Sequence, residues 1–443
     1  MRINPEFQRQ LYLECSQSRL IGTPVLLWII FTFSYIIDDH QFGNNTQHAA
    51  ILIFCLLTMF WGARQSLNSL NEEFSEHTWD TQRLSALSPW QLIWGKLFGS
   101  TIMTWYGGLI CLTVFTLASA NVSDPAMLIF FAAGTAILFQ ATGLLVSLIG
   151  LNHGQRRNGL LIFLAIAGYI FAQAPIVVWS YFTKGGERFL PTGDIAWYHL
   201  NISNLSIQQL NLLLAIFWCL VGNYRLMAKE LGIRTLPWVW IAFVIFLIIY
   251  LGGFIPDSAY SFSLAAFGVC GFLTYACVLA ERSDAMQLKR LLKLFEEKNL
   301  RRLAEEIPIW CLSLLMAMPF ALILSFSNNP YQFFSNLLHF YPLCIMFLIL
   351  RDCALYLFFV YGKYPQRAFS LSLLSAALLY GIIPGIFSAT GGFWLAALSF
   401  PLRADSEILA IVLAGLQLAA VLYLLYRRWR LKVVTIQPDA AVK

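Results

Sequence analysis

The chain has 443 residues, of which 59% are hydrophobic and 12% are charged, and its formal net charge is +6. A water-soluble domain normally carries about 25% charged residues, so this composition excludes an ordinary soluble globular protein. The excess of basic residues follows the membrane topology described below. Contact with anionic membrane lipid accounts for it, and a nucleic-acid partner is not expected.

Apolar stretches follow one another along the whole chain. Spanning a bilayer takes about 20 mostly apolar residues, and a chain of this length can supply twelve such segments. The sequence therefore predicts an all-α, polytopic membrane protein with about twelve transmembrane helices. In chain order these are Leu20–Ile37, Ala49–Trp61, Leu97–Ala118, Met127–Leu151, Gly159–Tyr181, Leu210–Tyr224, Trp238–Phe254, Phe262–Ala280, Ile309–Phe326, a tenth between Phe333 and Tyr361, Phe369–Phe387, and Ile408–Tyr426.

The basic residues lie in alternate gaps between these stretches. All but four of the 29 Lys and Arg residues lie in the two tails and in every second gap. The exceptions are Lys184, Arg188 and Arg403 in the opposite gaps and Arg351 inside an apolar stretch. Because Lys and Arg concentrate in cytoplasmic loops, the pattern predicts that both termini are cytoplasmic. The first stretch follows polar residues through Arg19 and is predicted to be an uncleaved anchor.

Loop lengths repeat after the sixth span. The longest cytosolic gap is Gly62–Lys96 in the first half and Glu281–Pro308 in the second. The longest external gap is Phe182–Gln209 in the first half and Ser388–Glu407 in the second. Internal repeats of this kind are common in transporters, so we expect a six-plus-six pseudo-repeat. The predicted halves are residues 1–226 and 227–443.

The first long cytosolic gap has the richest pattern of charged and aromatic residues. Four acidic residues stand there at spacings of three and four, which predicts one acidic helix face. They are Glu72, Glu73, Glu76 and Asp80. Further on, Ser88 and Gln91 can form a capping box around Pro89, so a helix is predicted to begin there. The alternative is a solvated loop whose Trp residues act only as interfacial anchors.

The order of motifs in this gap resembles the permease subunits of type-2 ABC exporters. An acidic stretch precedes Thr78-Trp79-Asp80-Thr81-Gln82-Arg83, Leu84-Ser85 and Pro89-Trp90 follow, and Gly95-Lys96-Leu97 opens a helix. The resemblance implies a segment that couples to a separate ATPase. It also implies an amphipathic stretch before the first span, here Asn4–Arg19, and short external re-entrant helices between the fifth and sixth spans. The implied coupling residues are Glu72, Glu73, Glu76, Thr78, Trp79, Asp80, Gln82, Arg83, Pro89, Gly95 and Lys96.

The same resemblance implies a function, namely a permease that forms the translocation path and exports a hydrophobic or amphipathic substrate. ATP would be hydrolysed by a partner with a P-loop, because Gly95-Lys96 and Gly362-Lys363 lack the Ser or Thr that a P-loop requires. No enzymatic activity and no cofactor are expected of this chain. The implied location is a bacterial inner membrane. The chain departs from the family in having about twelve spans where six are usual, and a fused pair, acting as a dimer or a pseudo-dimer, would explain this.

The second half has no Gly-Lys motif in its long cytosolic gap. Instead, residues 282–306 place leucines and Phe295 on one helical face and basic residues on the rest. This pattern predicts a basic amphipathic helix that lies on anionic lipid. Docking on a protein partner is the alternative.

Arg351 and Asp352 interrupt the tenth span. If that span is Tyr341–Tyr361, both charges lie within the membrane, where they pair or line a cavity. If it is Phe333–Leu350, they mark its cytosolic end. The run Gly392–Phe400 is apolar but too short to span, so it is either a re-entrant helix or a surface loop. Three neutral polar residues, Gln140, Gln173 and Gln417, are expected to form hydrogen bonds between helices.

Two other functions fit the sequence. A twelve-helix secondary transporter driven by an ion gradient fits the span count, with Asp352 as its only intramembrane acid. A membrane-embedded transferase would use external acids and histidines, namely Asp38, Asp39, Asp194, His40 and His199. No metal-binding motif is present, so none of these functions is expected to need a metal.

Overall fold

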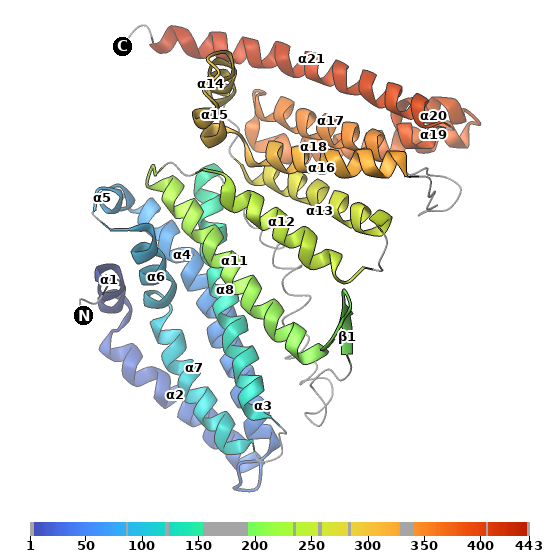
Figure 1. Cartoon of the computed structure of the whole chain (residues 1–443). Helices are drawn as coiled ribbons and strands as arrows, with labels where there is room; N and C mark the ends of the chain where they lie inside the picture. The colour runs from blue at the N-terminus through green and yellow to red at the C-terminus, as the bar shows by residue number, and fades with distance from the viewer. Residues whose placement is uncertain are drawn as a thin grey trace. The chain divides into compact units, whose positions relative to one another are not determined.

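The structure is a computed structural model that describes residues 4–85, 87–119, 124–153, 194–233, 236–255, 259–281, 285–327, 341–404 and 406–440. The described residues are almost entirely helical (Figure 1). They divide into two compact units, one comprising Met1–Ala196 and Leu200–Thr235 and the other Trp197–His199 and Leu236–Lys443. The predicted fifth span Gly159–Tyr181, with Gln173, lies outside the described residues.

The described elements of unit 1 are mainly helices. They are α1 (Pro5–Glu14), α2 (Gln17–Ile37), α3 (Asn44–Phe54), η1 (Cys55–Trp61), α4 (Gly62–Ser75), α5 (Trp79–Arg83), α6 (Pro89–Gly99), α7 (Ile102–Ala118), α8 (Pro125–His153) and α11 (Asn204–Glu230). Before α11, the strands β1 (Asp194–Trp197) and β2 (Leu200–Ser203) form a two-stranded sheet.

From Leu236 onward, every regular element described in unit 2 is a helix. Its elements are α12 (Trp238–Gly252), α13 (Ala259–Ala280), α14 (Ala285–Glu296), α15 (Leu300–Glu306), α16 (Ile309–Phe326), α17 (Pro342–Val360), η2 (Pro365–Arg367), α18 (Ala368–Ala376), η3 (Ala377–Ile382), α19 (Ile383–Ala389), α20 (Phe393–Ser399), η4 (Pro401–Arg403) and α21 (Glu407–Ala440).

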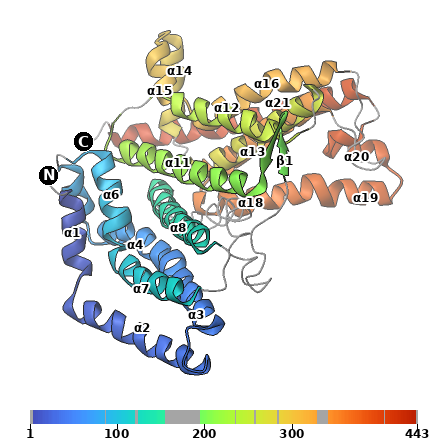
Figure 2. The same cartoon turned by 60° about the horizontal axis from the view of Figure 1, so that its bottom comes forward.

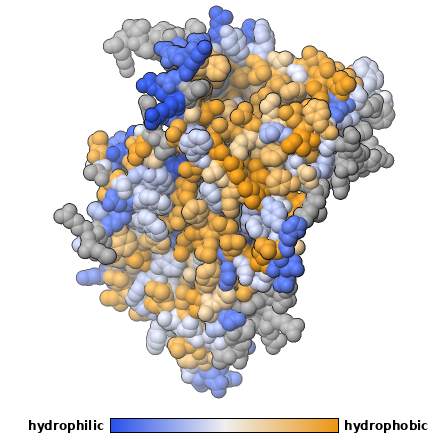
Figure 3. Space-filling model, in the orientation of Figure 1, coloured by the Kyte–Doolittle hydropathy of each residue, from blue (hydrophilic) through white to orange (hydrophobic). Residues whose placement is uncertain are grey.

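Long apolar helices confirm a polytopic, all-α membrane protein. Among the described residues, nine continuous helical segments are long and apolar enough to cross a bilayer, and α6 with α7 makes a tenth across a bend of 51°. The helix α12 is apolar but shorter. Every predicted span outside residues 159–181 coincides with one of these elements. Many of their large apolar side chains are exposed (Figure 3), as expected of helices that face lipid. The location of the termini stays a prediction.

The second candidate span is longer than its apolar stretch indicates. One continuous helix runs from Asn44 to Ser75 through α3, η1 and α4, so it continues into the predicted cytosolic gap. Its last part buries Ser66, Leu70 and Glu73 against neighbouring helices. In η1 the carbonyl of Thr58 accepts a hydrogen bond of 2.9 Å from Gln140 of α8, and this confirms that Gln140 links helices.

The end of the short helix α20 lies beside the first half of α21, which is a candidate span. The side-chain amide of Gln417 donates to the carbonyl of Leu398 over 2.6 Å, at the end of α20. Because Gln417 lies ten residues after Glu407, this contact is about 15 Å along α21 from its start. The small residues Ala397 of α20 and Ala410 and Ala414 of α21 belong to the same buried core. The arrangement favours the re-entrant interpretation of Gly392–Phe400.

Candidate functional sites

The first candidate site, the Lys96 cluster, brings four charged side chains together in unit 1, of which three are buried and that of Arg9 is 38% exposed. It consists of Glu6, Arg9 and Gln10 of α1, Glu73 of α4, Gln82 of α5 and Lys96 of α6. Lys96 is 0% exposed, and its ammonium group contacts carboxylates from two other helices. The nearest is Glu73, and Glu6 Oε1 lies 3.4 Å from Lys96 Nζ. The indole ring of Trp79 faces the ammonium group at 5.8 Å.

Polar side chains complete the hydrogen bonding of the two carboxylates. Arg9 donates to both oxygens of Glu6, over 3.0 Å and 2.8 Å, and also pairs with Glu73. Gln82 donates to Glu73 over 2.8 Å, and Gln10 donates to Glu6 over 3.1 Å. Two cations therefore balance two anions, as buried charges require. The cluster joins α1, α4, α5 and α6 at one point.

Glycines on α6 let α1 approach closely enough to form the cluster. A Cβ atom added at Gly95 would lie 2.5 Å from Cγ of Glu6, and one added at Gly99 would lie 2.6 Å from Cβ of Gln10. Any side chain at either glycine would push α1 away. Both views of the fold show α1 beside α6 (Figures 1 and 2). The helix α6 begins at Pro89 with the predicted capping box between Ser88 and Gln91.

The amphipathic stretch predicted before the first span is present as α1, but its buried face is polar. Glu6 and Gln10 are buried, whereas Tyr12 and Leu13 are largely exposed. Burial alone would raise the pKa of Glu6, but the hydrogen bond from Arg9 and the charges of Lys96 and Arg9 outweigh it. The pKa of Glu6 is therefore lowered below its ordinary value of 4.5. Glu6 is thus held as a carboxylate.

The prediction of one acidic face across residues 72–80 is wrong. The helix α4 ends at Ser75, and His77 adopts a positive φ of 58°, so the chain turns before α5 begins. Glu73 points into the Lys96 cluster, while Glu72, Glu76 and Asp80 are exposed. The turn brings Trp79 into the interior, which a single straight helix could not do.

Trp79 anchors α5 to the body of unit 1. The side chain is 3% exposed and lies in a buried core with Leu70, Leu92, Leu144 and Met227, to which four other helices contribute. The ring of Phe74 stacks on it with centroids 5.3 Å apart. Around this anchor, Arg83 and the exposed acids remain at the surface, and Leu84 is 88% exposed. The segment around α5 is therefore packed against unit 1 on one side and exposed on the other.

The structure sorts the predicted coupling residues into two groups. Glu73, Trp79, Gln82, Gly95 and Lys96 form the Lys96 cluster or its immediate support, and Pro89 is buried at the start of α6. The other predicted residues lie on the exposed surface of α4, the turn after it and α5, namely Glu72, Glu76, Thr78, Asp80 and Arg83. The sequence pattern did not indicate Glu6, Arg9 or Gln10, because they lie far away along the chain.

The second candidate site, the Asp352 cluster, lies halfway along α17 in unit 2. It consists of Tyr275 of α13, Arg351 and Asp352 of α17, Tyr380 of η3 and Gln417 of α21. The helix α17 continues to Val360, which favours the alternative that the span is Tyr341–Tyr361. Arg351 is 1% exposed and donates to Asp352 Oδ1 from Nε over 3.0 Å and from Nη2 over 2.8 Å.

Neutral groups provide the remaining hydrogen bonds of Asp352 and Arg351. The hydroxyl of Tyr275 donates to Asp352 Oδ2 over 3.0 Å, and the hydroxyl of Tyr380 donates to the same oxygen. Arg351 Nη1 donates to Gln417 Oε1, and the guanidinium lies 5.0 Å from the centre of the Tyr380 ring. Sequence reasoning identified the Arg-Asp pair but not the two tyrosines, which carry no signal at their own positions.

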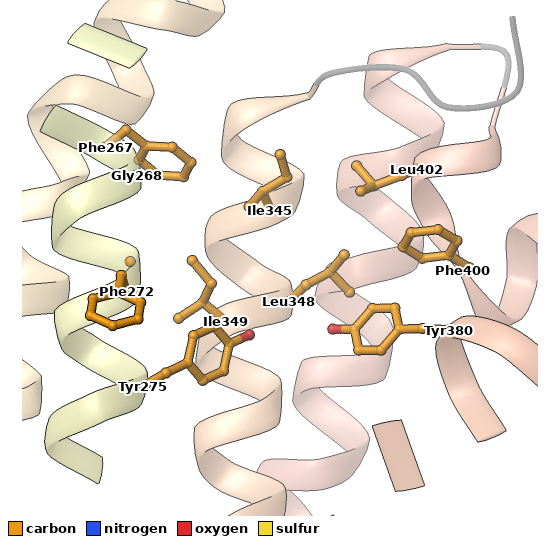
Figure 4. Close-up of a pocket in the computed structure, with 11 residues that line it drawn as sticks. Phe267, Gly268, Phe272, Tyr275, Ile345, Leu348, Ile349, Tyr380, Phe400 and Leu402 are labelled. Atoms are coloured by element: carbon orange, nitrogen blue, oxygen red, sulfur yellow. The ribbon is translucent and has the colours of Figure 1, made fainter. Parts of the chain in front are cut away.

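A cavity of about 330 Å³ opens next to this cluster (Figure 4). Most of its lining is apolar and comes from α13, α17 and the segment after α20. Tyr275 and Tyr380 are its polar members, and Figure 4 shows their hydroxyl oxygens on the same side of the cavity. The volume is at the lower end of the range for ligand pockets, roughly 300–1,000 Å³.

The prediction of a single basic amphipathic helix over residues 282–306 is wrong, because the chain turns at Lys298, which adopts a positive φ of 53°, and so forms two helices, α14 and α15. The basic amphipathic pattern itself is present in α14. Leu291 is buried, Leu292 and Phe295 are exposed, and Arg290 and Lys293 extend into solvent. Trp429 Nε1 donates to the carbonyl of Ala285 over 2.9 Å and thereby ties α14 to α21. This apolar and basic face suits anionic lipid, and what covers it stays a prediction.

The acids considered for a transferase are placed by local structure. Asp38 accepts hydrogen bonds from Asn45 and Thr46 and so holds the turn between α2 and α3. Asp39 and His40 occupy positive φ in that turn, and Asp194 is exposed on β1. Within the described ranges, no group of three or more His, Cys, Asp or Glu residues could hold a metal ion.

Comparisons with known proteins give no relative of this chain. No family model, no curated protein and no solved structure matches it. The class that the fold defines is therefore an all-α polytopic membrane protein with two internal ion clusters. Any narrower function has to be argued from those clusters.

Proposed function

We propose that the chain is the membrane permease subunit of an ABC transporter, which forms a translocation path and couples to a separate ATPase, with export as the direction. Its predicted location is a bacterial inner membrane. The partner would carry the P-loop that this chain lacks. The surface that would meet the partner consists of Glu72, Glu76, Asp80, Arg83 and Leu84, referred to here as the docking surface.

The observation that carries the proposal is the attachment of this surface to a candidate span. A permease has to sense nucleotide binding in another protein, so the contact element must move together with a transmembrane helix. Buried Glu73 of α4 pairs with Lys96 and accepts a hydrogen bond from the partly buried Gln82 of α5, and Lys96 lies in α6, the first part of a candidate span. Trp79 fixes the same segment to the core of unit 1. A flexible solvated loop would have neither attachment.

The docking surface also has the composition of a contact site. Glu72, Glu76 and Asp80 give it negative charge, Arg83 adds a donor, and Leu84 adds exposed apolar area. A single exposed leucine is ordinary on a protein surface. Leu84, however, lies beside charged residues and directly follows α5, which Trp79 attaches to the core of unit 1. Charges at such a surface set the specificity and rate of association more than its affinity.

Co-purification tests the proposal. The tagged chain, extracted from its native membrane in mild detergent, should bring down a P-loop ATPase. Reversing charge with Glu76→Lys or Asp80→Lys should weaken this association, and the double variant should abolish it while membrane insertion stays normal. Asp124→Lys is the matched control, because Asp124 is also exposed but lies at the opposite end of a candidate span.

Two outcomes would contradict the proposal. The first is a stable extracted complex that holds no ATPase and shows no ATP-dependent activity. The second is an ATPase that binds the double variant as well as it binds the natural chain, because this would remove the docking surface from the interface.

A second candidate function is a secondary transporter driven by an ion gradient. The Asp352 cluster favours it, because ionisable residues within membrane helices mark ion and proton pathways. Arg351 and Asp352 lie halfway along a candidate span and join three further elements. Uptake in sealed vesicles that depends on an imposed ion gradient and proceeds without ATP would support this function over the first.

A further inference from the structure

We propose that the cavity beside the Asp352 cluster binds a neutral amphipathic molecule, with an apolar body in the cavity and a hydroxyl head that donates a hydrogen bond to Tyr275. The cavity lies wholly within unit 2. This inference is independent of ATPase coupling, because binding is measured without ATP or a partner protein.

The polar side of the cavity offers an acceptor and no free donor. Tyr275 uses its one hydroxyl hydrogen on Asp352, and among the described residues no other group donates to its oxygen. A phenolic oxygen keeps lone pairs for a further donor. Arg351 is 1% exposed, does not line the cavity and is directed at Asp352 and Gln417. An anionic head would therefore find a carboxylate behind the hydroxyl groups and no cation within reach.

Charge balance also excludes a cationic head. Arg351 already neutralises Asp352, so an ammonium ion would leave a net positive charge in an apolar site. The effective penalty for burying an unpaired ion is several kcal/mol. A hydroxyl group adds no charge and satisfies the acceptor. The chemistry of the site thus selects a neutral hydrogen-bond donor.

The rest of the cavity suits an apolar body that enters from the lipid. Phe267, Ile349 and Phe400 give it apolar walls. On α13 the mouth is formed by Gly268 and Phe272, and Phe272 is 60% exposed on a candidate membrane-spanning helix. A Cβ atom added at Gly268 would meet nothing within 4 Å, so this glycine leaves open space where a side chain would stand (Figure 4).

Photolabelling in lipid nanodiscs tests the site. The probe is a long-chain alcohol that carries a diazirine, and the labelled peptide should contain Phe267–Tyr275. An unlabelled alcohol should compete, and its methyl ether should compete about fivefold less well, the factor for loss of one ordinary hydrogen bond. The corresponding long-chain amine should compete no better than the ether. These competition experiments need only the natural protein. Equal competition by the alcohol and the ether, or stronger competition by the amine than by the ether, would overturn the proposal.

Two variants locate the binding. Gly268→Leu fills the open space and should abolish labelling, while Gly22→Leu, at a helical glycine of unit 1 that also has nothing within 4 Å, should leave it unchanged. In Tyr275→Phe the alcohol and its ether should compete equally, because the acceptor is gone. Labelling of Gly268→Leu at the natural level would contradict the assignment.

The source of the ligand is distinguished by the lipids that accompany the protein. A hydroxyl-bearing lipid that co-purifies with the natural chain, and is lost in Gly268→Leu, identifies a membrane lipid. Labelling by the added alcohol, without such a co-purifying lipid, identifies an amphiphile supplied from outside the membrane. Both results support the site and differ only in the origin of its ligand.

Discussion

The two ion clusters each bury a basic side chain almost completely, yet they differ in how they are closed. The ammonium group of Lys96 meets two carboxylates, and the charge of Arg9 balances the second, so the cluster joins four elements through ion pairs and hydrogen bonds. Arg351 meets one carboxylate, and neutral hydroxyl and amide groups supply the rest. A cavity lies against those neutral groups. We propose that the first cluster transmits motion to the membrane helices and that the second lies beside a binding site.

Removing Lys96 should have the largest effect, because it leaves two buried carboxylates facing a single cation. We expect Lys96→Met to lower the free energy of unfolding by about 3–5 kcal/mol, the range for breaking a buried ion pair. Lys293→Met is the matched control, since that side chain is 75% exposed, and it should cost less than about 1 kcal/mol. Thermal or denaturant unfolding in detergent measures both. A similar cost for the two variants would contradict the role of the Lys96 cluster.

Removing Arg351 should cost less, because Asp352 keeps two phenolic donors and its side chain is 18% exposed. We expect a loss of about 2–3 kcal/mol for Arg351→Met. Adding Asp352→Asn removes the stranded charge and should recover part of that loss. The same unfolding assay applies, and a double variant less stable than the single one would show that the two charges are not paired.

Lowering the pH should weaken the Lys96 cluster through Glu6. Its pKa in the folded chain is lower than the ordinary 4.5, so its contribution is fully present above that value and is lost as the pH falls through the folded pKa. Glu6→Gln should therefore be less stable than the natural chain at about pH 7, and the difference should shrink at pH values below 4.5. Melting temperatures across that range measure it. A difference that stays constant with pH would refute the role of the Glu6 carboxylate.

The smallest effects should come from the tyrosines of the Asp352 cluster. Tyr380→Phe removes one hydrogen bond to a carboxylate and should cost about 1–2 kcal/mol. Tyr275→Phe should cost less, because Tyr275 is 36% exposed and its loss leaves Tyr380 on the same oxygen. Tyr423→Phe, at a tyrosine that is 64% exposed, is the control and should change stability very little. If Tyr275→Phe proved the more harmful, Tyr380 would not be the main support of Asp352.

The helices could be predicted well from the sequence alone, because a membrane span is recognised from consecutive residues. Apolar length located every described span, and the capping box at Ser88 located the start of α6. The sequence also indicated part of each cluster, since Glu73, Gln82 and Lys96 belong to one motif, Arg351 precedes Asp352, and Gln417 is a polar residue within a predicted span. The sequence did not indicate the remaining residues that other helices contribute to the two clusters. Glu6 and Arg9 resemble ordinary charges of an amphipathic stretch, and Tyr275 and Tyr380 resemble interfacial anchors, until packing brings them to a carboxylate.

Site-specific crosslinking in the native membrane tests the central claim most directly. A photoreactive amino acid in place of Asp80, on the docking surface, should crosslink to a soluble protein that carries a P-loop. The same residue in place of Tyr423, which is exposed on a candidate membrane-spanning helix, should not yield this product. Crosslinking of position 80 only to lipid, or to proteins without a P-loop, would contradict the proposal that this surface couples the membrane helices to an ATPase.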